Sequence, residues 1–443
     1  MKKLTLLVLS TLLTTSCNLF TSPYPIYDPN AEIVDVYPAV YNLKDLNTQY
    51  DEYNSAPPPA YNFPRKLVTD TMFVYSTNSG TEGKNFDIWK GKVTFEQKSR
   101  LRGQKNPDPT VESKRIAPFL KDEINTNSNE FGPYFFYNPK PEKVVVSPPT
   151  DENKFSINSL RNASDSRPLY SSILEQKADK EILGDNIFFF ASDKGGDLDI
   201  YFYSPKFGIR EFFGNKKGSN ERYFTYDYKR NVAYFASDRD GKYDIYKFEN
   251  KTGNFNFQDV FNNKDLEKYI VKADEFNSPE NDTCPVVVGD HLVFASDRVG
   301  TRGGYDIYLS WYTHDNRGEN LKWQKPKNMQ DIVDDYYKYK TYDESSGFQK
   351  YASKDSYIPK EEVKNLNTKV NTQYDEFRPF IIENLYNNQY SEIHQAESSD
   401  YSTEQNPSRL YEKPSSMIFS SNRPEGKGGF DLYLGILPSL YRF

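Results

Sequence analysis

Short apolar runs separated by polar turns recur along most of the chain. The runs are rich in Phe, Val and Ile and end in Ser followed by Asp or Asn, as in IFFFASD at 187–193 and LVFASD at 292–297. After each turn a second run begins with Asp-Ile-Tyr or a close variant. Runs of this length and composition are typical of strands buried on both faces. The pattern therefore predicts a β-hairpin in every copy, with a polar turn that contains Gly.

This hairpin phrase occurs five times. The copies are VYSTNSGTEGKNFDIW at 74–89, FASDKGGDLDIY at 190–201, FASDRDGKYDIY at 235–246, FASDRVGTRGGYDIY at 294–308 and FSSNRPEGKGGFDLY at 419–433. A catalytic site is needed once, whereas a turn is needed in every repeat, so we expect the shared polar residues to be structural. These residues are Ser192, Asp193, Asp199, Ser237, Asp238, Arg239, Asp244, Ser296, Asp297, Arg298, Asp306, Ser421, Asn422, Arg423 and Asp431.

Within each turn we expect the Asp after the Ser, such as Asp238, to accept hydrogen bonds from turn amides. We also expect the Arg of the turn to pair with the Asp that opens the second run. The expected pairs are Arg239 with Asp244, Arg298 with Asp306, and Arg423 with Asp431.

A second phrase precedes each hairpin and leads from acidic or amide residues into an apolar stretch, as in NTQYDEFRPFII at 371–382. This phrase predicts a further strand, and segments after the hairpin, such as REFFG at 210–214 and LKWQKPKN at 321–328, can supply a fourth. Ser192 and Ser237 are 45 residues apart. A four-stranded unit with a period of this size is the signature of a β-propeller blade.

We predict an all-β protein, a β-propeller of four-stranded antiparallel blades, with six blades of which five are clear and one is degenerate. Ser147 lies 45 residues before Ser192 and would belong to the degenerate blade, with KFSINSL at 154–160 as its decayed Asp-Ile-Tyr strand. DSRPLYSS at 165–172 would open the next blade. Little sequence follows the last copy, so we expect segment 32–43 to supply the missing strand and close the ring.

The phrase F-x-S-[DN]-R-x-G-x-x-D-[IL]-Y resembles the WD40-like PD40 repeat. That repeat occurs in the six-bladed TolB propeller and in many periplasmic or outer-membrane lipoproteins. The resemblance covers about residues 45–443 and implies a propeller of the bacterial envelope. The chain departs from the pattern through insertions that we expect to project from one end of the propeller, near residues 92–125, 250–275, 328–370 and 385–412.

The first residues, MKKLTLLVLSTLLTTSC, combine two lysines, a short apolar run and small polar residues before Cys17. They predict a secretory signal peptide, and they resemble a bacterial lipobox, which implies that Cys17 carries a lipid. The alternative is an ordinary signal peptide with an unmodified Cys. Asn18 stands where an Asp would favour retention at the inner membrane, so the resemblance points to the outer membrane, facing the periplasm rather than the cell surface. The expected domains are a signal peptide at 1–16, an anchor Cys and spacer at 17–44, and the propeller at 45–443.

Composition supports a folded protein without a nucleic-acid partner. Apolar residues make up only 36% of the chain, but the 36 Tyr and 31 Phe residues are typical of strand-rich folded proteins. The formal net charge is −7, and the basic residues are interspersed with acidic ones. A surface of this kind does not attract a phosphate backbone.

No motif in the sequence predicts catalysis or a cofactor. Asp238, Asp240 and Asp244 have the spacing of a calcium loop, but the bidentate Glu of an EF-hand is missing, so we favour a structural role. The three His residues are far apart in the sequence, which argues against a zinc site or a catalytic triad. Cys284 lies in a predicted strand, where a small buried hydrophobe is expected rather than a nucleophile. We therefore predict no catalytic residue, no metal and no cofactor.

The favoured hypothesis is a non-enzymatic scaffold, anchored to the outer membrane by its lipid, that binds an envelope protein or peptide. The Tyr-rich segment 334–357 is a candidate contact surface, although it can equally be a solvated loop. One alternative is a carbohydrate-active hydrolase or lyase with carboxylates at the mouth of the propeller channel. The other is a module that binds a sugar or a peptide, which would show as a deep pocket.

Overall fold

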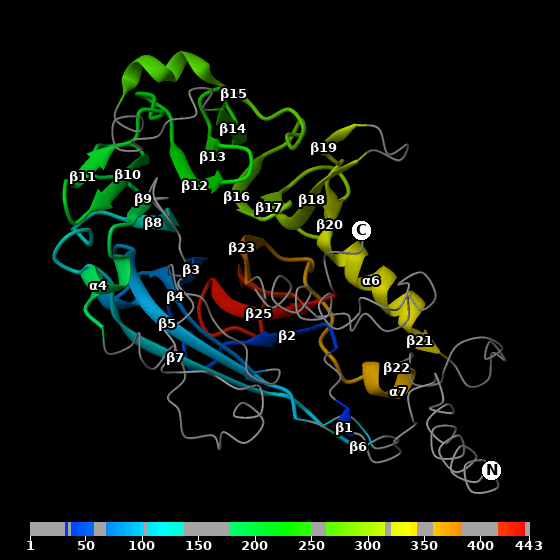
Figure 1. Cartoon of the computed structure of the whole chain (residues 1–443). Helices are drawn as coiled ribbons and strands as arrows, with labels where there is room; N and C mark the ends of the chain where they lie inside the picture. Colours follow the sequence, from blue (N-terminus) through cyan, green and yellow to red (C-terminus); the bar gives the residue numbers. More distant parts are fainter. Residues whose placement is uncertain are drawn as a thin grey trace, which may run out of the picture.

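Five antiparallel sheets surround a common centre (Figure 1). The structure is a computed structural model that describes residues 32–33, 37–56, 68–98, 100–101, 105, 107–136, 177–249, 263–314, 320–342, 358–382 and 415–438. Each sheet is one blade, and the innermost strand is the one that directly precedes the hairpin in the sheet, β3, β8, β12, β16 or β23 (Figure 1). The predicted all-β propeller of four-stranded blades is confirmed.

Each blade is built from the phrases seen in the sequence. Blade 1 contains β3 (Glu52–Ala56), β4 (Val68–Thr77), β5 (Asp87–Glu96) and β7 (Thr110–Pro118). Blade 2 contains β8 (Glu130–Phe136), β9 (Ile187–Ser192), β10 (Asp199–Ser204) and β11 (Gly208–Glu211). Blade 3 contains β12 (Glu221–Asp227), β13 (Val232–Ser237), β14 (Asp244–Glu249) and β15 (Ile270–Lys272).

Blades 4 and 5 complete the ring. Blade 4 contains β16 (Asp282–Val288), β17 (His291–Ser296), β18 (Asp306–His314) and two short outer strands, β19 (Leu321–Trp323) and β20 (Lys327–Asn328). Blade 5 contains β23 (Glu376–Ile382), β24 (Ser415–Ser421), β25 (Asp431–Leu437) and β2 (Ala39–Asn42). Because β2 precedes blade 1 in the chain and pairs with β25, the prediction that segment 32–43 closes the ring is confirmed for residues 39–42, whereas residues 32–33 pair with residues 100–101 instead.

Hydrogen bonds between blades show that the ring closes with five members. The backbone N–H of the acid that opens each innermost strand donates to a carbonyl of the preceding blade. The five bonds are Glu130 to Phe86 (2.7 Å), Glu221 to Leu198 (2.6 Å), Asp282 to Tyr243 (2.8 Å), Glu376 to Tyr305 (2.7 Å) and Glu52 to Phe430 (2.8 Å). The last of these joins blade 5 to blade 1.

The predicted count of six blades is therefore wrong. The phrase at 128–136 does not belong to a separate blade, because β8 pairs directly with β9, with Phe131 opposite Ala191. The segments assigned to the degenerate blade, around Ser147, 154–160 and 165–172, lie outside the described residues.

Within the described residues, five further helical segments and two small sheets decorate the ring. They are η1 (Ser79–Thr81), α4 (Asp179–Leu183), η2 (Lys264–Tyr269), α6 (Met329–Lys340), α7 (Lys360–Val363), the pair β1 (Glu32–Ile33) with β6 (Arg100–Leu101), and the pair β21 (Thr341–Tyr342) with β22 (Ile358–Pro359). The helix α6 lies beside blade 4, and Ile332 and Val333 are buried in the core shared with blades 1 and 5 (Figure 1). Among the described residues, no helix has the length and apolar character needed to cross a bilayer.

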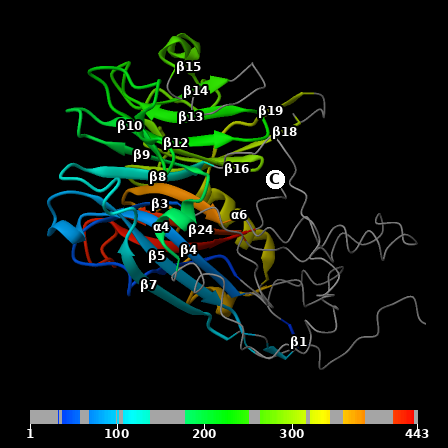
Figure 2. The same cartoon turned by 60° about the vertical axis from the view of Figure 1, so that its left-hand side comes forward.

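The expected insertions differ in kind. Residues 92–125 mostly extend the blade, because β5 and β7 form a long pair from Trp89 opposite Pro118 to Glu96 opposite Thr110. β4 follows β5 over its whole length, from Val68 opposite Glu96 to Thr77 opposite Asp87, and Figure 2 shows these long strands together. The described parts of 250–275 and 328–370 contain η2, β15, α6, β22 and α7. Residues 385–412 lie outside the description.

Aromatic side chains fill the spaces between adjacent blades. Phe189 of blade 2 stacks on Phe224 of blade 3, with ring centroids 3.8 Å apart. Phe212 meets both Phe224 and Phe235 edge to face. The high aromatic content of the sequence thus forms the cores between the sheets, where large rings bury much apolar area.

A bulge in each innermost strand turns one residue toward the left-handed backbone region. In every case it is the third residue of the strand, and the pairing with the second strand shifts register there. The five residues and their φ angles are Asn54 (54°), Gly132 (57°), Tyr223 (63°), Cys284 (57°) and Arg378 (43°). Non-glycine residues rarely adopt this conformation, so its recurrence around the centre marks a feature of the architecture.

Candidate functional site

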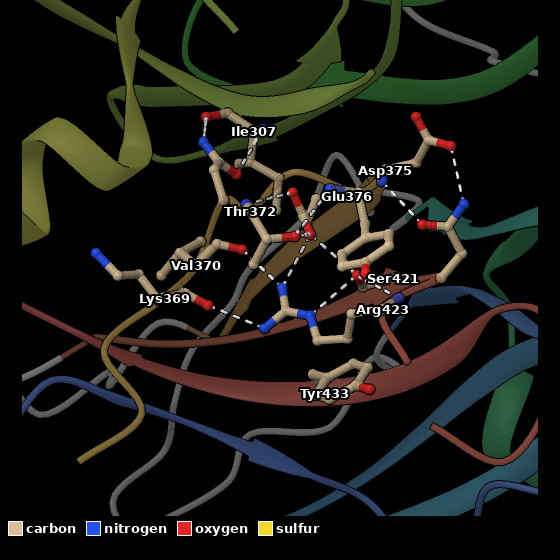
Figure 3. Close-up of polar contacts among 12 residues, drawn as sticks. Ile307, Lys369, Val370, Thr372, Asp375, Glu376, Ser421, Arg423 and Tyr433 are labelled. Atoms are coloured by element: carbon tan, nitrogen blue, oxygen red, sulfur yellow. Dashed lines mark hydrogen bonds and ion pairs between the residues drawn. The ribbon is translucent and has the colours of Figure 1, made fainter. Parts of the chain in front are cut away.

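The Ser and Arg of the hairpin turns bind the buried acid of the innermost strand. In blade 5, Glu376 accepts hydrogen bonds from Arg423 (3.0 Å), Ser421 (3.0 Å) and the hydroxyl of Thr372 (2.7 Å) (Figure 3). Arg423 also donates to the carbonyls of Lys369 and Val370, each at 2.9 Å. Glu376 is fully buried and Arg423 is 3% exposed, so this network ties the turn to the entrance of the same blade.

Blades 3 and 4 repeat this ion pair, in Arg239 with Glu221 (3.2 Å) and Arg298 with Asp282 (2.5 Å). The expected pairing of these arginines with the Asp of the third strand is therefore wrong. The reason is that Nε of each Arg binds the Ser hydroxyl of its own turn, which directs the guanidinium toward the innermost strand.

The Asp residues that open the third strands have other partners. Asp431 accepts from the backbone N–H of Lys427 and Gly428, and Asp306 accepts from the N–H of Arg302. Asp244 pairs with Lys242 and Lys272, and Lys272 also lies 3.1 Å from Asp240. Lysine side chains thus lie where a calcium ion would sit, and the described residues contain no cluster of acids, His or Cys suited to a metal.

The residue after the Ser, or after Thr77 in blade 1, forms an acid–amide pair with the residue before the buried acid. Asp238, for example, accepts with its carboxylate from both the backbone and the side-chain N–H of Asn220, at 2.7 Å each, so the carboxylate binds the entering loop. The turn amide of Gly241 donates instead to the backbone carbonyl of Asp238, at 2.8 Å. Every blade has one acid and one amide in this pair, although which position holds the acid varies. The pairs are Asp51 with Asn78, Asn129 with Asp193, Asn220 with Asp238, Asn281 with Asp297, and Asp375 with Asn422.

A second amide joins each blade to the preceding one. Asn371 accepts from the backbone N–H of Ile307 and donates to the carbonyl of the same residue, both at 2.9 Å (Figure 3). The sequence analysis did not assign this Asn, although an Asn stands five or six residues before the buried acid of every blade. The equivalent pairs are Asn47 with Leu432, Asn125 with Ile88, Asn215 with Ile200, and Asn277 with Ile245.

A pocket of about 320 Å³ opens at the centre of the ring, on the end where the hairpin turns lie. We call it the axial pocket. Blades 1, 2, 3 and 5 supply its lining, which is mostly aromatic. The lining residues are Asp51, Tyr53, Phe86, Phe131, Leu198, Arg222, Tyr223 and Phe430.

Two positions of the repeat place most of these side chains. One is the residue directly before the Asp of the third strand, as in Phe86, Leu198 and Phe430. The other is the residue directly after the buried acid of the innermost strand, as in Phe131 and Arg222. Because these positions line the pocket in blades 1, 2, 3 and 5, they can differ between copies while the flanking residues stay constant. That contrast is the signal by which the sequence could have revealed the pocket.

The aromatic rings of the lining contact one another and the neighbouring rings. Phe86 and Phe131 have centroids 4.7 Å apart, and Tyr53 lies 5.0 Å from Phe430 and 5.7 Å from Phe377. Contacts at these distances hold rings in fixed orientations. The pocket therefore has preformed apolar walls.

Two arginines reach the same tyrosine ring at the centre. The guanidinium of Arg222 lies 3.9 Å from the ring centroid of Tyr243 and 4.9 Å from that of Tyr223. The guanidinium of Arg378 lies 5.1 Å from the centroid of Tyr223, and its Nη2 donates to the carbonyl of Pro133 in blade 2 at 3.1 Å. Arg378 is 1% exposed, and its Nε and Nη1 have no hydrogen-bond partner.

The other titratable groups near these arginines are weak acids. Burial raises the pKa of Tyr53, Tyr223 and Cys284 above their ordinary values. The same burial lowers the pKa of Arg378, yet a guanidinium remains protonated in proteins. The two guanidiniums therefore place positive charge at the centre of the ring, and Asp51 is the acid in the described lining of the axial pocket.

The remaining predicted residues fall in three groups. Cys284 is fully buried in β16, as expected for a structural position. Of the Tyr-rich segment 334–357, the described residues 334–342 belong to α6 and β21 rather than to a loop, and Tyr337 is buried. Cys17 and the signal peptide lie outside the described residues.

Comparisons with known proteins assign no family. No family model matches the chain, and no curated protein matches it. Among solved structures, TolB from Agrobacterium tumefaciens is similar with 10% identity and a TM-score of 0.29, over 67% of this chain and 90% of that one. TolB from Acinetobacter baumannii is similar with 9% identity and a TM-score of 0.25, over 88% of this chain and 63% of that one. The assignment of the fold rests on the strand order and on the ring of hydrogen bonds between blades.

Proposed function

We propose that this chain is a non-enzymatic binding protein of the bacterial envelope, held at the outer membrane by a lipid on Cys17. The propeller acts as a scaffold in an envelope assembly and holds its partner at the axial pocket. The observation that carries this proposal is that the repeated residues and the variable residues have different roles. The turn residues that repeat are engaged in contacts within and between blades, whereas the central positions that vary line a preformed aromatic pocket.

The chemistry of the pocket favours binding over catalysis. A glycosidase needs two carboxyl groups that face the scissile bond. The lining of the axial pocket contains one, Asp51, which accepts hydrogen bonds from the N–H of Phe430 (2.8 Å) and from Asn78 (3.3 Å). Rigid aromatic walls with few polar groups are typical of sites that bind a ligand or a protein side chain.

The location is supported by the sequence around Cys17, namely the signal-like apolar run and the lipobox-like residues before it. If Cys17 carries the anchor, Cys17→Ala will release the protein from the membrane fraction. Protease treatment of intact cells will then separate the two faces of the outer membrane. Protection of the membrane-bound protein supports the periplasmic side, and digestion supports the cell surface.

Affinity purification from gently solubilised membranes tests the scaffold role. We expect the wild type to recover one envelope partner in a stoichiometric amount. We expect Phe131→Ala, which removes one wall of the axial pocket, to lose that partner. A matched variant, Tyr269→Ala, removes a 55% exposed aromatic ring on η2 and should keep it. Recovery of the wild type alone in several detergents would contradict the proposal.

A further inference from the structure

We propose that the axial pocket recognises a carboxylate attached to an apolar group, with Arg222 as the residue that binds the carboxylate. This inference rests on the proposed function and names the chemistry of the ligand. The ligand is either the carboxyl-terminal residue of a polypeptide or a small apolar acid, since the two present the same groups to the pocket.

The first observation is that Arg222 lines the pocket without an acidic partner. Its guanidinium faces the rings of Tyr243 and Tyr223, and its Nε is buried without a hydrogen-bond partner. Arg239, Arg298 and Arg423 in the turns each pair with a buried carboxylate. The three turn arginines therefore form ion pairs with buried acids, whereas Arg222 forms none with a described residue.

The second observation is the excess of positive charge behind Arg222. Arg378 contacts the same ring of Tyr223, and within the described part of the chain neither arginine pairs with a carboxylate. Cation–π contacts offset only part of the cost of removing a guanidinium from water. The neighbouring Tyr53, Tyr223 and Cys284 add no negative charge near neutral pH, because burial raises their pKa values.

The third observation is the match between the arginine and a carboxylate. A guanidinium presents a planar fork of N–H donors that binds both oxygens of a carboxylate. A bound carboxylate would accept hydrogen bonds from the guanidinium of Arg222 and compensate the charge shared with Arg378. A carboxylate is also the anionic group at the carboxyl-terminal end of every polypeptide.

The walls and the size of the pocket define the rest of the ligand. Tyr53, Phe86, Phe131, Leu198 and Phe430 form an apolar surface beside Arg222. The carboxylate of Asp51, the acid in the described lining, accepts hydrogen bonds from the backbone N–H of Phe430 and from the side chain of Asn78. The volume of about 320 Å³ lies at the lower end of the range for ligand pockets. The pocket therefore suits one apolar side chain with its carboxylate and excludes a long folded segment.

Calorimetry with matched probes tests the proposal on the purified propeller. The probes are N-acetyl-phenylalanine, its neutral amide, and a pentapeptide that ends in Phe with either a free or an amidated carboxyl group. We expect each acid to bind about tenfold or more tightly than its amide, with the difference decreasing at high salt. Equal affinity for acid and amide, or no binding of either acid, would overturn the proposal.

Two variants locate the binding. Arg222→Met should reduce the preference for acid over amide to within about twofold, because only the charge-dependent part is lost. Arg115→Met is the matched control, since Arg115 also stacks on an aromatic ring, Trp89, at 3.8 Å but lies on the outermost strand β7. It should keep the full preference. If Arg222→Met keeps the wild-type preference for the acid over the amide, Arg222 does not bind the carboxylate. If that variant does not fold, the acid–amide comparison on the wild type still tests the ligand chemistry.

The probes also separate the two sources of the carboxylate. Tighter binding of the free pentapeptide than of N-acetyl-phenylalanine assigns the site to a chain end, and the reverse order assigns it to a small acid. Failure of this test is distinct from failure of the proposed function. A partner recovered from membranes without any preference for the acid rejects only the ligand chemistry, whereas binding of the acid without a partner rejects only the scaffold role.

Discussion

Asn422 donates its side-chain amide to the carboxylate of Asp375 at 2.9 Å, and its own Oδ1 accepts the backbone N–H of Asp375 at 2.9 Å. In blade 3 the same two positions hold Asp238 and Asn220, with the acid and the amide exchanged. Either order gives one side-chain donor and one acceptor. All five blades therefore keep one acid and one amide at these two positions, although the position that holds the acid varies. This explains why the repeated phrase tolerates both Asp and Asn after its Ser.

The exchanged acid–amide pairs predict that a second substitution restores the stability lost through a first one. Asn422→Asp places two carboxylates at hydrogen-bond distance and should lower the free energy of unfolding by about 1–3 kcal/mol. The double variant Asp375→Asn with Asn422→Asp recreates the arrangement of blade 3 and should recover most of that loss. Urea denaturation of the wild type and the variants measures the coupling. If the double variant is as unstable as the sum of the two singles, the pair does not act as a unit.

Loss of Arg423 should be far more harmful than loss of an exposed arginine. Arg423→Met leaves the carboxylate of Glu376 buried without its cation, which costs about 3–5 kcal/mol. Adding Glu376→Gln to that variant should recover part of the stability, because the uncompensated charge is removed. Arg210→Met on the exposed face of β11 is the control, expected to change stability by no more than about 0.5 kcal/mol. Equal effects of Arg423→Met and Arg210→Met in thermal denaturation would contradict the network.

The buried acids of blades 1 and 2 predict that stability falls as the pH rises. Their turns lack the Arg, and burial raises the pKa of Glu52 to about 7 and that of Glu130 to about 7. A carboxyl group whose folded pKa is raised stabilises the folded state below its unfolded pKa, near 4.3, and loses that contribution as the pH passes the folded value. Each group contributes a slope of at most about 1.4 kcal/mol per pH unit in this window.

Glu130→Gln should remove one of these contributions. We expect urea denaturation between about pH 5 and pH 8 to give a shallower loss of stability for this variant than for the wild type. Glu112→Gln, on an exposed position of β7, should keep the wild-type slope. A wild-type slope in Glu130→Gln would show that Glu130 does not titrate in this range.

Closure of the ring by β2 predicts a large effect of a single cross-link. Ala39 lies opposite Ile436 in the pairing of β2 with β25. A disulfide between Ala39→Cys and Ile436→Cys would join the two ends of the propeller and should raise the free energy of unfolding by about 2–4 kcal/mol. The reduced form of the same variant is the control. No difference between the oxidised and reduced forms would mean that β2 is not required to hold blade 5 in the ring.

Repetition made much of the fold predictable. The five hairpins and the closing strand follow from phrases that occur again and again with the same order of apolar and polar residues. The number of blades was not predictable from spacing, because β8 and β9 pair although fifty residues separate Phe136 from Ile187. A long connection within a blade has the same length as a further blade, so only the pairing of strands distinguishes the two.

The polar partners and the pocket were less predictable, for a different reason. Asp244 is the nearest acid after Arg239 in the hairpin, but packing brings the guanidinium to Glu221, which precedes it on the innermost strand. Arg222 and Phe131 occupy a position that varies between copies within a constant frame. In the sequence alone, differences between the copies at this position look like loss of the repeat pattern. Only the arrangement of the blades around one centre shows that these residues line a common pocket.

Site-specific cross-linking in intact cells tests the binding role of the axial pocket most directly. p-Benzoylphenylalanine replaces Phe131 in the pocket, and in the control it replaces Tyr269 on the exposed outer side of blade 3. We predict that light joins the Phe131 variant to one envelope protein through the carboxyl-terminal peptide of that protein, and that the control captures nothing comparable. The absence of a product above the control, or cross-links to many proteins through internal peptides, would contradict the binding of an envelope partner at the axial pocket.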